Sequence, residues 1–379
     1  MRIQLEEDVQ TQNMPCHSLR SPLSIHDLLL QCCQSQQVRL AVSAPALLSC
    51  PFAFCHGAKT MTALSRRPRA SPAQEAALAN DAFAVLSPAL ARLTHLQQLV
   101  ITEQLIARRT ATSTQPLAEA LACLPDLREL QLRVPLPRSA GRELAPALAS
   151  LTRLTCLDLS SNSLGPIGGA QDPAASLFAP LAEPLGALPS LSVLDLSGTD
   201  LGSAITLFPI SLSLLKVLRM SEAGLNGWGA PLAAALEHLP HLTELDLGRN
   251  FLNDSDAPAL APALAGLTHL TNLNLAACVS VPRGAVTVLP SLRSLAPTLR
   301  SLVLSHCVLG ELEAAELPGV VRSLSALTGL QRLELLGAML GLQQQAATLL
   351  AEVSSRRQRA KVFEQLTYMG MVHGHRVVE

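Results

Sequence analysis

Three aspartates occupy the same place in a recurring Leu-Asp-Leu pattern: Asp158, Asp195 and Asp246. Carboxylates held close together can serve as a general acid and a general base. On neighbouring strands they would form a row along one face of a sheet, because alternate strand residues share a face. We favour the simpler interpretation, a polar strand face in contact with water, and expect no catalytic residue in this row.

Histidine and cysteine are the other side chains that could bind a metal or act as nucleophiles. His95, His241 and His269 recur at one place, in Leu-x-His-Leu, which indicates a role in a turn. Cys50-x4-Cys55 followed by His56 resembles half of a zinc motif, but no second pair follows at zinc spacing. We therefore expect no metal and no cofactor.

Catalytic motifs of fixed spacing are also missing from the sequence, which contains no GxSxG, Walker loop, HExxH or GxGxxG. We therefore predict that the protein is not an enzyme. The chain has nine cysteines without the spacing of a disulfide framework, and no secretory leader is recognisable. These features predict a reducing compartment and a cytoplasmic location.

The elements that position these side chains come from a repeat of the form LxxLxxLxL. Leucine makes up 78 of the 379 residues, and nine copies of the repeat follow one another at a mean interval of about 29 residues. The last two leucines of each copy lie two residues apart, so they point to the same face of a strand. Intervening segments such as 231–239 and 258–267 have leucines at helical spacing. The third leucine of each copy, called the repeat leucine below, is Leu99, Leu130, Leu157, Leu194, Leu218, Leu245, Leu273, Leu302 or Leu333.

Several copies continue after the strand, as DLSSNSLG at 158–165 and DLGRNFLND at 246–254. This pattern resembles the leucine-rich repeat family, and the long interval is similar to its ribonuclease-inhibitor-like subclass, which pairs each strand with a helix. The resemblance implies an α/β solenoid, a horseshoe with a parallel concave sheet and convex helices. It also implies that the Asn/Cys position of the repeat is buried and supports the turn out of the strand; that position holds Asn162, Asn250, Cys278 and Cys307.

The chain divides into four segments by its composition. Residues 1–70 are expected to form a weakly structured extension, and residues 1–60, upstream of Met61, are a candidate for non-native sequence. Residues 71–92 predict a helical N-terminal cap, 93–342 the repeats, and 343–379 a helical C-terminal cap with a basic tail. The interval from Leu157 to Leu194 is the longest, and its excess falls in the Gly- and Pro-rich insertion 165–173.

The overall charge balance argues against two classes of partner. The formal net charge is −1, so neither nucleic acid nor an anionic membrane surface gains a general electrostatic attraction. Mean hydropathy is +0.31, yet no apolar run reaches the roughly 20 residues of a membrane span. We expect the partner to be another protein.

Our functional hypothesis is a non-catalytic scaffold or adaptor that binds another protein across its own concave face and loop rim. The alternative that Trp228 packs into the edge of the solenoid remains open. A regulator of a Ran-type GTPase is a second candidate, although that family has an acidic tail and residues 356–361 here are basic. A sensor of an immune-type receptor or a ubiquitin-ligase adaptor would need a further module before the repeats. The candidate binding residues are Asp158, Asp195, Arg219, Glu244, Asp246, Trp228, Arg249 and Phe251.

Overall fold

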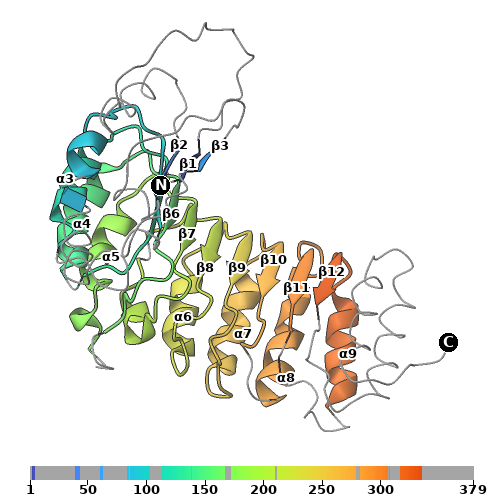
Figure 1. The fold of residues 1–379 in the computed structure, drawn as a ribbon. Coiled ribbons are helices and arrows are strands. Elements are labelled where there is room, and N and C mark those ends of the chain that lie inside the picture. Colours follow the sequence, from blue (N-terminus) through green and yellow to red (C-terminus); the bar gives the residue numbers. More distant parts are fainter. Residues whose placement is uncertain are drawn as a thin grey trace, which may run out of the picture. The chain divides into compact units, whose positions relative to one another are not determined.

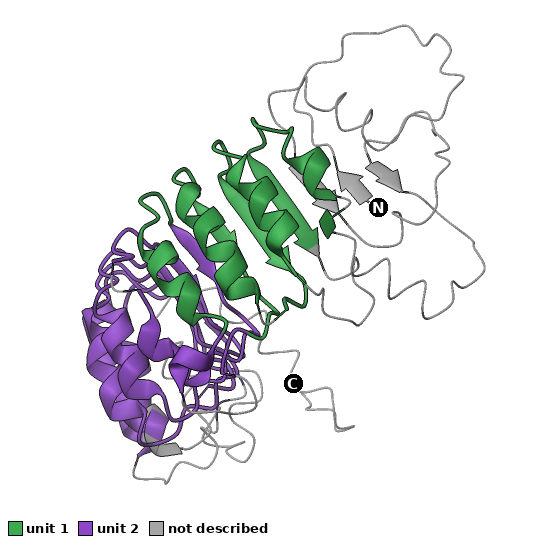
Figure 2. Ribbon diagram, turned by 90° about the vertical axis from the view of Figure 1, so that its left-hand side faces the viewer, with its two compact units in different colours: residues 1–163, 177–191 green, residues 164–176, 192–379 purple. Residues whose placement is uncertain are grey.

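The computed structural model of the 379-residue chain divides into two compact units (Figure 2). Unit 1 comprises residues 1–163 and 177–191, and unit 2 comprises residues 164–176 and 192–379. The structure describes residues 2–4, 39–42, 60–62, 83–84, 86–102, 113–137, 139–166, 172–209, 211–278, 282–305, 307 and 316–334.

Unit 1 contains a parallel sheet with helices on one side of it. Its strands are β2 (Arg39–Val42), β4 (Gln98–Thr102), β5 (Glu129–Arg133) and β6 (Cys156–Asp158), paired in that order. The helices α3 (Gln115–Ala122), α4 (Ala140–Ser150) and α5 (Ala179–Gly186) pack against one another in sequence. The repeat leucines Leu99, Leu130 and Leu157 are direct partners across these strands, as the repeat predicts.

Unit 2 repeats the same arrangement over six strands (Figure 1). They are β7 (Val193–Asp195), β8 (Val217–Arg219), β9 (Glu244–Asp246), β10 (Asn272–Asn274), β11 (Ser301–Val303) and β12 (Arg332–Glu334). Four helices stand side by side behind them: α6 (Gly229–Leu236), α7 (Ala257–Gly266), α8 (Pro282–Ser291) and α9 (Leu317–Ala326). All strand pairs are parallel and the repeat leucines again lie in register.

Burial of the repeat leucines explains why these very short strands form. Leu157, Leu194 and Leu245 are completely buried, and Leu333, in the last of the described strands, is 8% exposed. Each buried leucine contributes about 1.5–3 kcal/mol, but only when a neighbouring repeat covers it. The α/β leucine-rich-repeat solenoid expected from the sequence is therefore confirmed as the fold class.

The described α-helices are short, from 8 residues in α3 to 11 in α4. The interval from Leu194 to Leu218 is the shortest, and there the chain forms only a 3₁₀ helix, η5 (Gly202–Leu207). Two further 3₁₀ helices are η4 (Pro173–Ala175) and η6 (Leu292–Leu295). Helix α7 continues through Pro262 instead of breaking, because Pro258 and Pro262 both lie on its exposed side, where water can reach an unpaired carbonyl.

The expected terminal segments fall largely outside the described residues. Of the expected extension 1–70, the structure describes β1 (Arg2–Gln4) and β3 (Thr60–Thr62), which form an antiparallel pair, and β2 of the main sheet. Within the expected cap 71–92, residues 83–84 and 86–90 are helical. Residues 167–171 of the insertion and the whole segment 343–379 are not described.

Two contacts between consecutive repeats are close enough to test the packing. In unit 1, Thr114, which precedes α3, donates from its amide and its hydroxyl to one oxygen of Glu143 in α4, at 2.5 and 2.7 Å. In unit 2, Gly229 donates its amide to Asp256 at 2.8 Å, and a Cβ on this glycine would lie only 2.5 Å from the Cβ of Asp256.

The first prediction concerns Gly229. We expect Gly229→Ala to lower the free energy of unfolding by about 1–3 kcal/mol, because the added methyl group displaces Asp256 from its amide donors. Gly266→Ala is the matched control, since nothing lies within 4 Å of a Cβ at that helical position. Urea unfolding followed by circular dichroism measures both variants. Equal midpoints for the two variants would contradict the packing described here.

The second prediction concerns the acid stability of unit 1. Burial acts to raise the pKa of Glu143, but hydrogen bonds from Thr114 and Ser139 outweigh it and hold the pKa below its ordinary value. A lowered pKa contributes stability above the unfolded-state pKa of about 4.3, and this contribution is lost as the pH falls through the folded-state pKa. We expect Glu143→Gln to cost about 1 kcal/mol at pH 7 and nothing in strong acid. Thermal unfolding of the native chain and of Glu143→Gln, measured from pH 7 down to strong acid, provides the test. A difference in stability between the two that does not change with pH would exclude the ionic contribution.

Candidate binding surface

The side chains on either side of each repeat leucine form the surface that we call the sheet face. Strand geometry directs them away from the buried leucine. In unit 2 the residues before the repeat leucines include Val193, Val217 and Glu244, which are half-buried. The residues after them include Asp195, Arg219 and Asp246, in direct register across three strands and also half-buried. The sheet face thus combines apolar and charged side chains on a backbone that strand pairing holds in register.

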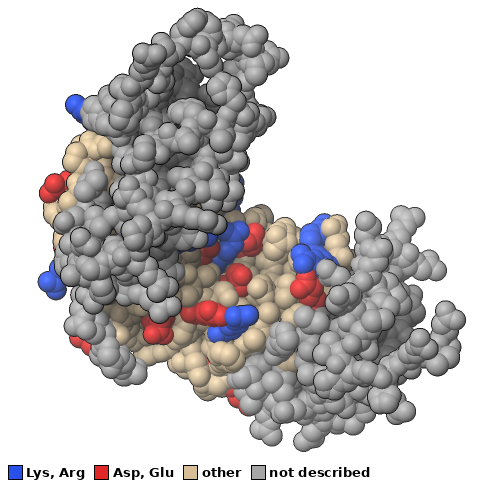
Figure 3. All heavy atoms as spheres, in the orientation of Figure 1, with Lys and Arg blue, Asp and Glu red and all other residues tan. Residues whose placement is uncertain are grey.

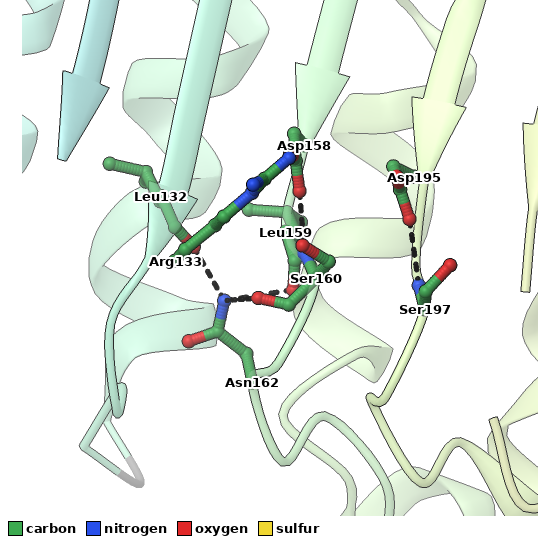
Figure 4. A network of polar contacts seen from close by, with 8 residues as sticks. All are labelled: Leu132, Arg133, Asp158, Leu159, Ser160, Asn162, Asp195 and Ser197. Carbon is green, nitrogen blue, oxygen red and sulfur yellow. Dashed lines mark hydrogen bonds and ion pairs between the residues drawn. The ribbon is translucent and has the colours of Figure 1, made fainter. Parts of the chain in front are cut away.

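The aspartate row has a structural role in each repeat. Oδ1 of Asp158, Asp195 and Asp246 accepts a hydrogen bond from the backbone amide two residues later, at 2.9, 3.0 and 2.9 Å respectively. Asn274 does the same for Ala276 at 2.9 Å. This Asx turn ends β6, β7, β9 and β10 and bends the chain there. Figure 4 shows it at Asp158 and Asp195.

Ion pairs occupy part of the sheet face (Figure 3). In unit 1, Arg133 donates from Nε to Oδ2 of Asp158 at 2.7 Å, so both oxygens of this buried carboxylate are engaged. In unit 2, Arg219 contacts Oε1 of Glu244 through Nε at 2.8 Å and Nη2 at 2.7 Å, although its register partners are aspartates. Asp195 and Asp246 make no ion pair with any residue that the structure describes.

The turns that follow the strands form a second surface, the turn edge, defined by the residues four and six positions after each repeat leucine. Arg249 lies there and pairs with Glu222 of the preceding repeat at 2.5 Å. Phe251, in the same turn, is 55% exposed. Both have left-handed backbones, with φ of 57° for Arg249 and 48° for Phe251.

The backbone of Phe251 is unusual because of its residue type. The corresponding positions in the two preceding repeats hold Asp200 and Gly224, with φ of 50° and 69°. Glycine and aspartate tolerate this conformation, whereas a bulky side chain is strained in it. Trp228 precedes α6 and is half-buried. Among the described residues, Trp228 and Phe251 make no ring contact with each other.

Seven of the eight candidate binding residues belong to unit 2, and Asp158 belongs to unit 1. Two exposed or charged residues were missed by the sequence analysis. Glu222 neutralises Arg249, and Leu214 is 57% exposed at the position four before its repeat leucine. Leu214 could have been noticed, because the other copies have a polar residue or glycine at that position.

The Asn/Cys positions lie beneath the turn edge and connect each repeat to the previous one. Nδ2 of Asn250 donates to the carbonyls of Met220 and Leu247 at 2.7 and 2.8 Å, and its Oδ1 accepts from the amides of Ala223 and Leu225 at 2.9 and 3.4 Å. Cys307 contributes a weaker version, with Sγ 3.0 Å from the carbonyl of Leu275. All of these side chains are buried.

Asn162 makes only half of this network (Figure 4). Its Nδ2 donates to the carbonyls of Leu132 and Leu159 at 2.6 and 2.8 Å, but its buried Oδ1 has no hydrogen-bond partner. The positions that correspond to Ala223 and Leu225 in the preceding repeat are Pro135 and Pro137. Proline has no amide hydrogen, so the two donors that Asn250 uses do not exist here.

The thiol of Cys278 is buried among mostly apolar side chains. Cys278 lines a cavity of about 10 Å³ in unit 2, a space that holds at most one water molecule. Burial raises the pKa of the Cys278 thiol far above its usual range, and this effect outweighs the backbone amides of Leu252 and Asn250, which favour the thiolate. The described residues contain no group of three or more potential metal ligands.

Comparisons with known proteins agree with the repeat geometry. A family model described as Leucine Rich repeat matches residues 150–170 and 238–261. These segments contain β6 with Asn162 and β9 with Asn250, the two places where strand, Asx turn and buried asparagine occur together. The chain is a leucine-rich repeat protein.

Two solved structures are similar to part of the chain. The TLR13–ssRNA13 complex is 19% identical with a TM-score of 0.37, over 67% of this chain and 30% of the other. The Toll–Spatzle complex, described as a hub in Drosophila development and innate immunity, is 15% identical with a TM-score of 0.40, over 66% of this chain and 34% of the other. The leucine-rich repeat protein thus spans about a third of either chain. No curated protein matches its sequence, and none of its described helices is long and apolar enough to cross a bilayer.

The third prediction compares the two buried asparagines. We expect Asn250→Ala to lower the free energy of unfolding by about 2–4 kcal/mol, because it leaves buried carbonyls and amides unpaired. Asn162→Ala should cost about 1 kcal/mol less, since no amide depends on its Oδ1. Urea unfolding of both variants, with hydrogen exchange to locate the loss, is the measurement. A larger loss for Asn162→Ala would refute this account of the two prolines.

Proposed function

We propose that this leucine-rich repeat protein is a non-catalytic scaffold that binds another protein through the sheet face and turn edge of unit 2. The observation that carries the proposal is Phe251, a large aromatic side chain that is 55% exposed on a left-handed backbone. A left-handed backbone costs free energy at a bulky residue, and more than half of the Phe251 surface stays in water. Strain of this kind concentrates at functional sites, and aromatic anchors dominate binding hot spots.

The neighbouring charges support a partner that brings hydrogen-bond donors. Arg219 and Arg249 are already neutralised by glutamates of adjacent repeats. Asp195 and Asp246 each commit one oxygen to an Asx turn and keep the other without an ion pair among the described residues. Trp228, half-buried at the start of α6, adds aromatic surface next to the turn edge. Lysine, arginine or amide groups of the partner would satisfy the remaining oxygens.

The repeat interval and the helices support assignment to the ribonuclease-inhibitor-like subclass. An α-helix follows β4, β5, β8, β9, β10 and β11 directly, and α5 follows β6 after η4. Between β7 and β8 the described residues contain only the 3₁₀ helix η5. A cytoplasmic location remains a prediction from cysteine usage. No feature of the described residues favours a regulator of a Ran-type GTPase. The basic residues at 356–361, which argue against that function, lie outside the described residues.

The fourth prediction separates binding from stability. Asparagine tolerates a left-handed backbone, so Phe251→Asn should leave the unfolding midpoint unchanged or raise it. Loss of the aromatic anchor should nevertheless weaken partner binding by about 2 kcal/mol, roughly 30-fold. The partner is first identified by affinity purification and mass spectrometry, and its affinity for the purified variants is then measured by calorimetry.

Leu214→Asn is the matched control, because Leu214 is 57% exposed in the same unit, on the other side of the strands from the turn edge. We expect it to bind the partner as the native chain does. Full affinity of Phe251→Asn, or an equal loss in Leu214→Asn, would overturn the assignment of the binding surface to the turn edge.

A further inference from the structure

Two exposed histidines form a pair on the side of the strands opposite the turn edge. His241 and His269 lie four residues before the repeat leucines of β9 and β10. Their ring centroids are 5.8 Å apart, with an angle of 41° between the ring planes. This pair belongs to unit 2 and is separate from the sheet face and the turn edge. A place in a turn, which their repeat position predicts, accounts for the backbone of these histidines but leaves their rings unexplained.

The backbone around the pair is held firmly. Next to each histidine is a completely buried leucine, Leu242 or Leu270. Two residues after each histidine, a threonine bonds to the previous repeat: Thr243 donates from its amide and hydroxyl to Lys216, and Thr271 does the same to Thr243. The bonds between Thr271 and Thr243, at 2.8 and 2.9 Å, tie the two histidine-bearing turns directly to each other.

The ring nitrogens of this pair are uncommitted. Neither His241 nor His269 hydrogen-bonds to another residue in the part of the chain that the structure describes. Other described histidines differ in this respect, because Nδ1 of His95 lies 3.1 Å from Asp126 and Nδ1 of His238 lies 2.8 Å from the carbonyl of Ala234. Both rings of the pair are exposed, so they can rotate about their side-chain bonds without displacing packed atoms.

The spacing of the rings suits a shared metal ion. Imidazole nitrogen binds Zn²⁺ at about 2.0–2.1 Å, which places the ion roughly 3 Å from a ring centroid and allows two centroids to lie up to roughly 6 Å apart. The observed 5.8 Å falls within that limit. Neutral imidazole is a preferred ligand of zinc, copper and nickel, whereas calcium and magnesium prefer oxygen.

We propose that His241 and His269 form a two-histidine surface site for a borderline transition-metal ion such as Zn²⁺. The two imidazoles supply two ligands, and water completes the coordination, since the described residues contain no cluster of three donors. With two protein ligands the site binds more weakly than a structural zinc centre and leaves coordination positions open to an outside ligand.

Histidine-specific labelling tests the site in the intact chain. Diethyl pyrocarbonate modifies free imidazole nitrogen, and peptide mass spectrometry reports each histidine separately. When Zn²⁺ alone is titrated in, labelling of His241 and His269 should fall together, on the order of tenfold at saturation, while labelling of His238 stays constant. Continued labelling of both rings at saturating Zn²⁺ would overturn the proposal.

Single substitutions test whether the two rings act as one site. In His241→Gln, His269 should lose its protection by Zn²⁺, and His269→Gln should expose His241 in the same way. His238→Gln is the control and should leave the protection of both rings unchanged. If His269 stays protected in His241→Gln, or if His238→Gln abolishes protection, the two-histidine assignment is wrong.

Discussion

Burial of one leucine per repeat by its neighbours is the constraint on which the rest of this fold depends. A strand of three residues such as β9 cannot remove its own leucine from water, but stacking between β8 and β10 leaves Leu245 completely buried. The same register holds between consecutive strands within each unit. Because the leucine fixes which side of the strand faces inward, it also fixes which residues form the sheet face.

A second constraint follows directly from the first. Packing of the leucines buries the carbonyls that follow them, and buried carbonyls need donors. Asn250 supplies a donor to the carbonyl of Met220 and takes amides from the same preceding turn. Pro135 and Pro137 interrupt this network, because neither proline has an amide hydrogen to donate. Asn162 therefore keeps the bonds that its Nδ2 donates, but its Oδ1 stays unpaired. A solenoid tolerates such a defect because each repeat depends only on its neighbours.

The repeat predicts the fold much better than it predicts the surface. Register and burial follow from the spacing of leucines, because period and face are properties of a single strand. The role of the Asn/Cys position came from the family resemblance and not from that spacing. The replacement of a helix by η5 was not foreseen, although the short interval there is its cause. Pairing of Arg219 with Glu244, rather than with its register partners, depends on side-chain direction across two repeats, which the order of residues does not encode. For the same reason His241 and His269 could be placed in one register but not recognised as a pair.

The two constraints together limit which surface residues are free to serve binding. The residue before each repeat leucine takes no part in the turn, so side chains as different as Val193, Val217 and Glu244 occupy it. The residue after it is restricted, because Asp195 and Asp246 close the Asx turns and can offer a partner only their second oxygen. The turn edge is restricted in a different way, since its left-handed backbone favours glycine, asparagine or aspartate. An aromatic residue at Phe251 opposes that preference more strongly than the smaller or more flexible side chains of Ser161, Glu222 and Ala277, which share the left-handed backbone. This local conflict is the reason that we propose the turn edge, and not another part of unit 2, as the contact surface.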